Sequence, residues 1–232
     1  MVAPGEHQVG VGQELLAQCE SYLEQRSATS LFGGGLDSMA AFYFGLYGGC
    51  RLPGVLTSDV LQADIFRQAG YLELQRTCIL QRDLAGYRPV VNREIMQLRR
   101  QCQLQRAGDV TASNWWEASS LGQIDQVRFE LAVRNSHELL GKVSFWDIEP
   151  LASSWGIHAM GMLHFEVNDN QRRATLATFL LGEAIRELQS FGVTLVEVHA
   201  DEKDEELFSV YSNLGFQQVD TGIQFERPKS TS

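Results

Sequence analysis

Two adjacent arginines stand at the start of the strongest helical pattern in the sequence. Residues 174–190 have the apolar periodicity of an amphipathic helix, and Arg172 and Arg173 come directly before it. Positive charge at a helix N-terminus opposes the helix dipole, so this arrangement is unfavourable unless an anion compensates it. The free N–H groups of a first helical turn bind phosphate, and small residues such as Ala174 let the backbone come close. The segment predicts a phosphate-binding helix start; the plainer alternative is a basic helix start without a ligand.

Titratable side chains lie on the strand expected just before this helix, at residues 157–167. Strict alternation along a strand puts five of its residues on one face: His158, Met160, Met162, His164 and Glu166. Beside a ligand pocket, the two histidines and the carboxylate are candidates for acid–base chemistry, with Glu166 first. The alternatives are that they are solvent-exposed or hydrogen-bonded in the core, and that a water molecule acts as the base.

A third candidate is Tyr211, on the short helix expected at residues 205–213. Gly215 follows this helix, and glycine commonly ends helices in the left-handed conformation. In a core, Tyr211 would be an aromatic residue with a satisfied hydroxyl. The acidic run at residues 201–206 complements the helix dipole.

The elements that position these residues follow from hydrophobic periodicity and glycine stop signals. We expect helices at residues 12–25, 60–69, 174–190 and 205–213. We expect strands at residues 29–32, 72–84, 127–133, 139–148, 157–167, 194–199 and 219–226. Residues 85–122 are mixed and polar, so we interpret 85–109 as a linker.

The two halves of the sequence repeat one another. Residues 12–23 align with 177–188 at an offset of 165, and the expected strands at Thr29 and Thr194 keep this offset. IFRQAGY, from Ile65, aligns with VYSNLGF, from Val210, at an offset of 145. The difference of 20 residues matches an insertion in the first half, the glycine- and aromatic-rich segment 36–58. Because order and spacing agree, we interpret the chain as a tandem duplication; the alternative is a chance alignment of two ordinary helix–strand–helix units.

Composition limits the classes of function. The net charge of −10 argues against nucleic acid as a partner, because phosphate backbones bind to basic surfaces. No apolar run approaches the roughly 20 residues of a membrane-spanning helix, and the N-terminal residues lack the features of a signal peptide. The four cysteines are far apart, which argues against a disulfide framework or a zinc site and favours the reducing cytoplasm. We expect a cytoplasmic protein with no metal, no nucleic acid and no membrane as partners.

The order of elements from residue 157 to the C-terminus resembles the GNAT superfamily of N-acetyltransferases. In that family the turn before the long helix reads R/Q-x-x-G-x-G/A. Residues 172–177 (RRATLA) match it, except that Thr175 replaces the first glycine, where its hydroxyl can donate to phosphate. Residues 211–216 (YSNLGF) match the family pattern Y-x-x-L-G-F. The resemblance implies an α/β (α+β) fold with mixed, mostly antiparallel sheets flanked by helices.

The resemblance also implies a reaction: direct transfer of an acyl group from acetyl-CoA, or another acyl-CoA, to an amine. Tyr211 would protonate the leaving thiolate, and Glu166 or a water relay would take the proton of the amine. The co-substrate would be held by the strand end and the turn: Phe165, Val167, Arg172, Arg173, Ala174, Thr175, Leu176 and Ala177. The acceptor would be a small-molecule or peptide amine, and the acidic balance of the chain favours a cationic one.

The first half is interpreted as a partial, degenerate copy of this fold. Its turn keeps two glycines but has His7 in place of arginine, and Phe66 stands where the second half has Tyr211. It lacks the strands before the turn, which would expose a sheet edge for pairing with the second half or with another chain, as in a homodimer. We therefore predict a non-catalytic domain at 1–84 and a complete GNAT acyltransferase domain at 110–232. This tandem organisation resembles mycothiol synthase and related two-domain acetyltransferases.

Two other classes of function are weighed against this one. A non-catalytic acyl-CoA-binding or scaffold protein is favoured by Thr175 and by the partial first copy, while Tyr211 argues against it. A hydrolase built on Ser38 or Cys50 ranks lower, because no G-x-S-x-G motif or recognisable His/Asp arrangement accompanies them. The pair Trp115-Trp116 could line the acceptor pocket or anchor the linker.

Overall fold

A nine-stranded mixed sheet connects the two halves of the chain. The computed structural model describes residues 8–35, 52–108, 115, 125–148, 156–168 and 173–228. The strands are β1 (Phe32–Gly33), β2 (Val55–Leu56), β3 (Leu72–Asp83), β4 (Cys102–Arg106), β5 (Gln126–Val133), β6 (Leu139–Asp147), β7 (Ala159–Val167), β8 (Leu195–Asp201) and β9 (Gln217–Glu226). They follow the order β1-β9-β3-β8-β7-β6-β5-β4, and β2 also pairs with β9. Among the described strands, β7 and β8 form the one parallel pair.

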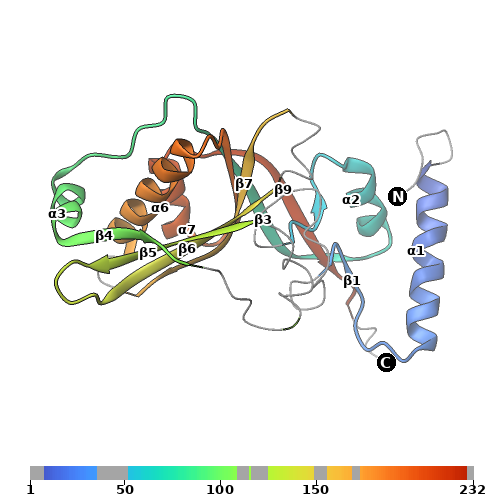
Figure 1. Ribbon diagram of the computed structural model, residues 1–232. Coiled ribbons are helices and arrows are strands. Elements are labelled where there is room, and N and C mark those ends of the chain that lie inside the picture. Colours follow the sequence, from blue (N-terminus) through green and yellow to red (C-terminus); the bar gives the residue numbers. More distant parts are fainter. Residues whose placement is uncertain are drawn as a thin grey trace.

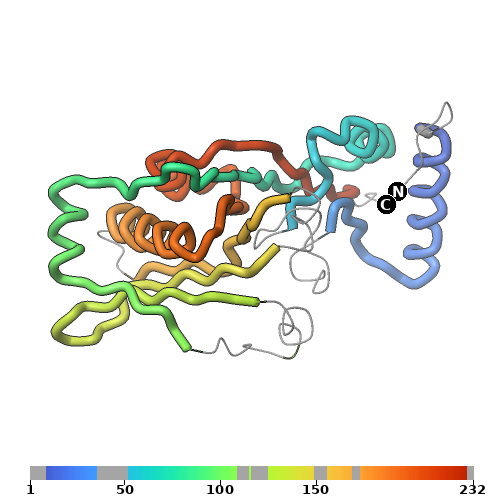
Figure 2. Tube along the Cα trace, turned by 45° about the horizontal axis from the view of Figure 1, so that its top comes forward, coloured from blue at the N-terminus to red at the C-terminus, as the bar shows by residue number. Residues whose placement is uncertain are grey.

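Five described helices flank this sheet. They are α1 (Gln8–Gln25), α2 (Val60–Gln68), α3 (Arg93–Gln101), α6 (Arg173–Ser190) and α7 (Glu205–Asn213). Figures 1 and 2 show α6 against the curved sheet, with α3 at one end of the molecule and α1 at the other. The fold class is the expected one, a mostly antiparallel sheet flanked by helices. None of the described helices is long and apolar enough to cross a membrane.

The main core lies between α6 and one face of the sheet, which we call the helix face. Leu180, Leu181 and Ile185 of α6 recur at helical spacing and are completely buried. They belong to one cluster with strand residues such as Val143 and Phe145 and with apolar residues of α3 and α7. Burying one such side chain stabilises the fold by about 1.5–3 kcal/mol. The core therefore fixes α6, and with it the helix start that the sequence assigns to phosphate.

Helices recur at the two offsets of the sequence repeat. Helices α1 and α6 both have 18 residues and begin 165 positions apart, while α2 and α7 both have nine and begin 145 positions apart. Asp59 and Asp204 cap α2 and α7 in the same way, each accepting a hydrogen bond from the backbone N–H three residues later. Gly70 and Gly215 follow these helices with φ angles of 81° and 79°.

The two halves exchange their last strands. Strand β3 of the first half lies between β8 and β9 of the second, and β9 in turn pairs with β1 and β2 of the first. The registers correspond as well: Gly33 pairs with Phe225, and Val198 pairs with Leu80, at the same offsets of 165 and 145. Each half thus supplies a strand to the sheet of the other. The division of the chain into two domains stays a prediction.

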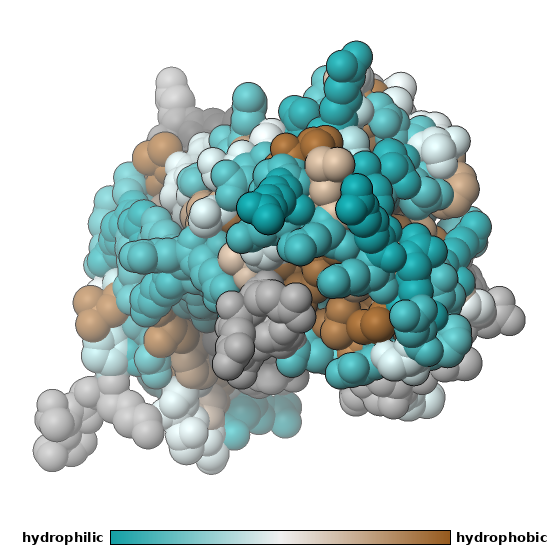
Figure 3. Space-filling model, turned by 90° about the vertical axis from the view of Figure 1, so that its left-hand side faces the viewer, coloured by the Kyte–Doolittle hydropathy of each residue, from teal (hydrophilic) through white to brown (hydrophobic). Residues whose placement is uncertain are grey.

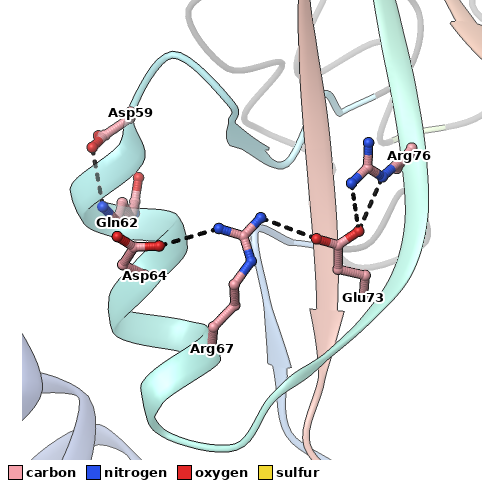
Figure 4. A network of polar contacts seen from close by, with 6 residues as sticks. All are labelled: Asp59, Gln62, Asp64, Arg67, Glu73 and Arg76. Atoms are coloured by element: carbon pink, nitrogen blue, oxygen red, sulfur yellow. Dashed lines mark hydrogen bonds and ion pairs between the residues drawn. The ribbon is translucent and has the colours of Figure 1, made fainter.

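Polar contacts join α2 to the start of the exchanged strand β3 (Figure 4). Arg67 lies 3.2 Å from Asp64 and 3.0 Å from Glu73, and Arg76 contacts the other oxygen of Glu73 at 2.8 Å. The hydrogen bond from Arg76 is the main cause that holds the pKa of Glu73 below its usual value. Because these groups are partly exposed, each contact contributes little by itself. Together they connect α2 to the start of β3 across the turn between the two elements.

Two parts of the chain differ from the expected elements. Residues 85–109, interpreted as a linker, contain α3 and β4, and β4 extends the sheet beyond β5. Helix α3 buries only Ile95 and Leu98, which are three residues apart, and Asn92 caps its start. Helix α1 begins at Gln8, earlier than the expected residue 12, and leaves apolar side chains such as Leu15 and Tyr22 exposed, whereas its counterpart α6 is buried.

Candidate active site

Strands β7 and β8 run side by side for three residues and then separate. Their pairing joins Ala159 to Leu195, Met160 to Val196 and Gly161 to Glu197. Beyond this point, β7 is paired with β6 up to Val167, and β8 is paired with β3 up to Asp201. The facing edges of the two strands therefore hold main-chain N–H and C=O groups that the opposite strand does not pair. Helix α6 begins a few residues after β7, so the diverging strands lead towards a helix N-terminus.

A β-bulge at Leu163 changes the face on which the end of β7 presents its side chains. Ser144 of β6 pairs with His164, but the next residue, Phe145, pairs with Met162, so β7 carries one extra residue. Cross-strand partners share a face. Met162 therefore lies on the helix face with Phe145, and His164 lies on the opposite face with Ser144.

The single face predicted for His158, Met160, Met162, His164 and Glu166 is therefore wrong. The two methionines are buried in the core under α6, whereas His164 and Glu166 are exposed. Phe165 and Val167 lie on the helix face and pack against that core. Strict alternation fails because the extra residue shifts the pattern by one position in the middle of the strand.

The predicted base, Glu166, is paired with a cation. Its carboxylate lies 3.1 Å from the Nζ of Lys142 on β6, and its side chain is 59% exposed. His158 Nε2 likewise lies 3.5 Å from the carboxylate of Asp147. Both side chains contact strand β6 at the surface of the sheet.

The first turn of α6 carries the predicted phosphate-binding residues. Arg173 lies 3.4 Å from Glu206 of α7, and the Thr175 hydroxyl donates to Glu94 of α3 at 3.1 Å. These carboxylates supply the negative charge that a helix N-terminus favours, so Arg173 does not need a bound anion to compensate it. Of the other predicted residues, Ala174 is exposed, Leu176 and Ala177 are buried, and Arg172 lies outside the described residues.

Tyr211 lies on the buried side of α7. It is 2% exposed and packs edge-on against Phe216, with ring centroids 5.6 Å apart. It belongs to the helix-face core together with Val198, a residue of β8 beyond the point where β7 leaves. In the first half, Phe66 of α2 takes this place and stacks on Phe225 without a hydroxyl to donate.

A buried carboxylate–imidazole pair, which the sequence patterns do not single out, lies on β8. His199 Nε2 is 3.2 Å from Glu197 Oε1, and neither side chain is exposed. The other carboxylate oxygen of Glu197 accepts a hydrogen bond from the Gln81 amide of β3 at 2.7 Å. Glu197 is the last residue of β8 paired with β7, so His199 stands where the strands have separated. In the sequence the pair appears only as VEVHA (residues 196–200). This alternation of apolar and polar residues is typical of a half-exposed strand and does not by itself indicate a functional site.

A cavity of about 400 Å³ lies at the other end of β7. Its wall includes Arg100 of α3, Arg134 of the β5–β6 turn, and Asn168, which directly follows β7. The cavity thus borders Asn168, the residue after β7, and none of its described lining residues belongs to β8. Figure 3 shows this end of the molecule as mostly hydrophilic.

Three sequence candidates, Ser38, Cys50 and Trp116, lie outside the described residues. Trp115 is 68% exposed. Within the described ranges, no three His, Cys, Asp or Glu residues are grouped so that they could hold a metal ion.

Comparisons with known proteins give the fold a name. No family model and no curated protein matches this sequence. Among solved structures, a tandem GNAT protein from the clavulanic acid biosynthesis pathway is similar over 97% of this chain and 72% of its own, with a TM-score of 0.62 and 16% identity. The chain has the GNAT fold.

A second structure with this fold is a GCN5-related N-acetyltransferase from Sphaerobacter thermophilus. It is similar over 75% of this chain, with a TM-score of 0.51 and 14% identity, and the match spans 59% of its own length. At such identities the GNAT fold describes how the elements are arranged, while activity has to be argued from the residues. The narrower resemblance to mycothiol synthase stays a prediction.

Proposed function

We propose that this protein is an acyl-CoA-dependent N-acyltransferase that transfers an acetyl group from acetyl-CoA to an amine. The observation that carries the proposal is the divergence of β7 and β8 directly before the start of α6. A pantetheine arm carries amides that can pair with open strand edges, and a pyrophosphate suits a helix N-terminus. Acyl-CoA carries both groups: the pantetheine arm follows the thioester, and the pyrophosphate follows the arm.

In this proposal, the phosphates lie at the first turn of α6 and the pantetheine arm lies along Phe165 and Val167. Arg172 and Arg173 supply positive charge, and Thr175 to Ala177 form the turn that the phosphates approach. Beyond Gly161, the main-chain groups on the edge of β7 that faces β8 are not paired with β8. An N–H on this edge can polarise the thioester carbonyl and stabilise the oxyanion that forms on attack.

Tyr211 is the proposed acid that returns a proton to the CoA thiolate. Its position in the helix-face core beside β8 supports this role, because the sulfur of a bound thioester would lie between the two strands. Glu166 is the base that the family resemblance suggests, but its contact with Lys142 at the sheet surface gives this assignment little support.

One specific observation favours a second candidate, a non-catalytic acyl-CoA-binding or scaffold protein. The carboxylates of Glu94 and Glu206 both contact the first turn of α6, where they oppose a second anion. A protein that has lost turnover could keep such contacts, because they cap the helix without a ligand.

The acceptor class and the compartment belong to the same proposal. A small-molecule or peptide amine that carries positive charge fits the net charge of −10. Cys78 and Cys102 are buried free thiols, and Cys19 is an exposed one, which supports a reducing compartment such as the cytoplasm.

The test is calorimetric titration of acetyl-CoA into the wild-type protein and into an Arg172→Glu/Arg173→Glu variant. We expect binding by the wild type and at least a roughly tenfold loss in the variant. Arg26→Glu, an exposed charge reversal at the end of α1, is the matched control and keeps the wild-type affinity. Absence of binding by the folded wild-type protein contradicts the proposal.

Turnover is then measured as release of CoA thiol with a panel of acceptors: spermidine, tyramine, glucosamine and a lysine-containing peptide. Transfer to any of them supports the enzyme. Binding of acetyl-CoA without transfer to any of them, or to hydroxylamine, supports the non-catalytic candidate.

A further inference from the structure

We propose that Glu197 and His199 form the base that takes the proton from the acceptor amine, and that Gln81 holds this pair in place. This inference rests on the proposed acyltransferase function and moves the role of base away from Glu166. The base is then a buried pair on β8, and the first half of the chain contributes to it directly.

The proposal gives each ring nitrogen of His199 a role. In this proposal Glu197 is ionised and only accepts hydrogen bonds, so Nε2 of His199 is the donor in their 3.2 Å contact. The lone pair then lies on Nδ1, which is the nitrogen that can accept a proton. Once the imidazole is charged, the adjacent carboxylate stabilises it, and the low dielectric of a buried site strengthens that attraction.

The position of the pair fits an attack on a thioester that lies between the strands. Glu197 and His199 alternate with Val196 and Val198, whose side chains belong to the helix-face core. The pair therefore lies on the opposite face of β8 from Tyr211. An amine that approaches from the side of His199 attacks a carbonyl in the gap, while the sulfur is protonated from the side of Tyr211. Acid and base act from opposite faces and do not exchange the proton between themselves.

Gln81 gives the first half of the chain a role in this site. It is the cross-strand partner of Glu197 in the β3–β8 register, and its amide donates to the carboxylate at 2.7 Å. At the repeat offset of 165, the positions of Glu197 and His199 correspond to Phe32 and Gly34. The first half thus has no such pair of its own, but its exchanged strand orients the pair of the second half.

The proton balance of the step is complete with these groups. His199 takes one proton from the ammonium form of the acceptor, and the free amine attacks the thioester carbon. The tetrahedral intermediate expels the CoA thiolate, which takes a proton from Tyr211, and the proton still on nitrogen restores Tyr211. The products are the amide and CoA thiol, and His199 releases its proton to solvent.

The experiment measures kcat, KM and the dissociation constant of acetyl-CoA for four variants, with the panel amine that the wild type acetylates fastest. His199→Gln should lower kcat about 100-fold, the scale of acid–base catalysis. Glu197→Gln should lower it about tenfold and Gln81→Met several-fold, because both change the orientation of the imidazole and leave Nδ1 in place. All three should bind acetyl-CoA within about twofold of the wild type, since they do not touch the phosphate end. His137→Asn, in the exposed β5–β6 turn, is the matched control and keeps the wild-type kcat.

Hydroxylamine as acceptor separates a base from a merely structural residue. Its nitrogen is largely unprotonated at neutral pH, so no proton has to be removed before attack. The loss in His199→Gln should therefore shrink to a few-fold with hydroxylamine. A kcat of His199→Gln equal to that of the wild type, or the same loss with both acceptors, overturns the inference.

A measurement on the intact chain covers the case in which the buried variants do not fold. In histidine-labelled wild-type protein, acetyl-CoA should shift the imidazole resonances of His199 and leave those of His137 unchanged. Unchanged resonances of His199 overturn the inference. Acetyl-CoA binding without any transfer overturns it as well but keeps the acyl-CoA site, whereas absence of binding overturns the proposed function itself.

Discussion

Glu206 of α7 lies 3.4 Å from Arg173, the first residue of α6. The two side chains are 43% and 41% exposed, so their attraction is worth about 0.2–1 kcal/mol. A phosphate bound at the start of α6 would have to compete with this carboxylate for the arginine. The ion pair between Glu206 and Arg173 is therefore expected to weaken the binding of an anion at the start of α6.

Replacing Glu206 should improve the binding of acetyl-CoA. In Glu206→Gln the competing charge is gone, and we expect an affinity about two- to fivefold higher at low salt, with the gain fading as salt screens it. Glu205→Gln, one residue earlier on the same helix, is the control because Glu205 is also exposed, whereas the ion pair of Arg173 is with Glu206. Calorimetry at two salt concentrations measures the difference; an unchanged or weaker affinity would place the phosphates elsewhere.

Removal of the Tyr211 hydroxyl should slow turnover. We expect Tyr211→Phe to lower kcat about 100-fold, because the thiolate then leaves without an acid, while the affinity for acetyl-CoA stays close to that of the wild type. The matched control is Tyr87→Phe: burial raises the pKa of Tyr87 to about 12, and its hydroxyl donates to the Gly182 carbonyl at 3.3 Å. Wild-type turnover in Tyr211→Phe would exclude the acid role and leave a packed aromatic.

The two glycines that end α2 and α7 give a test of the structural repeat. Both have φ near 80°, where a side chain costs about 1–2 kcal/mol. A Cβ on Gly70 meets no atom within 4 Å, while a Cβ on Gly215 comes within 3.2 Å of the Arg82 guanidinium. We expect Gly70→Ala and Gly215→Ala to lower the free energy of unfolding by about that amount, with the larger loss at Gly215. Urea denaturation measures both, and a loss at only one of them would mean that the two turns are not equivalent.

Asp220 should make stability depend on pH. Burial opposes its ionisation, but hydrogen bonds from Ser58, the Thr221 backbone N–H and Thr57 outweigh this and hold the pKa below 3.8. A lowered folded pKa stabilises the fold fully above the unfolded value, and this contribution is lost as the pH falls through the folded pKa. Asp220→Asn should therefore cost about 1–2 kcal/mol at pH 7 and clearly less at pH 3.

Urea midpoints at the two pH values check this prediction. Asp64→Asn is the control, because Asp64 is exposed and contacts Arg67 on the same helix. We expect a change of less than about 1 kcal/mol there. A cost of Asp220→Asn that does not depend on pH would show that the hydroxyl contacts act without its charge.

The sequence predicts best those elements that carry their own boundary signals. Helix α7 is observed at the expected residues 205–213, because Asp204 caps it and Gly215 ends it. Helix α3 was not expected, although Asn92 caps its start as Asp204 caps α7, because its residues are mostly polar and only Ile95 and Leu98 are buried. Strand β3 is observed at Leu72–Asp83, close to the expected residues 72–84, but the sequence does not show that its neighbours lie more than 100 residues away along the chain.

The candidate site was predicted less completely, for two physical reasons. A bulge leaves no mark on hydrophobic alternation until the neighbouring strand is known, so Leu163 reverses the predicted face of His164 and Glu166. The sequence also does not show that β8 is buried on both faces. The alternation of Glu197 and His199 with valines is typical of a strand with one solvent-exposed face as well as of a buried strand. Where the phosphates, the acid and the base lie stays a prediction until the variants are measured.

The exchange of β3 and β9 also constrains the order in which the chain can fold. Strand β3 pairs with residues 195–201 and with 217–226, so a nascent chain that has just left the ribosome has neither neighbour for it. Both edges of β3 therefore stay unpaired until residues 195–226 have been synthesised. Pairing over such a distance is slow, since a long loop must close before any contact forms. The sheet is then completed in one late event that involves both halves at once.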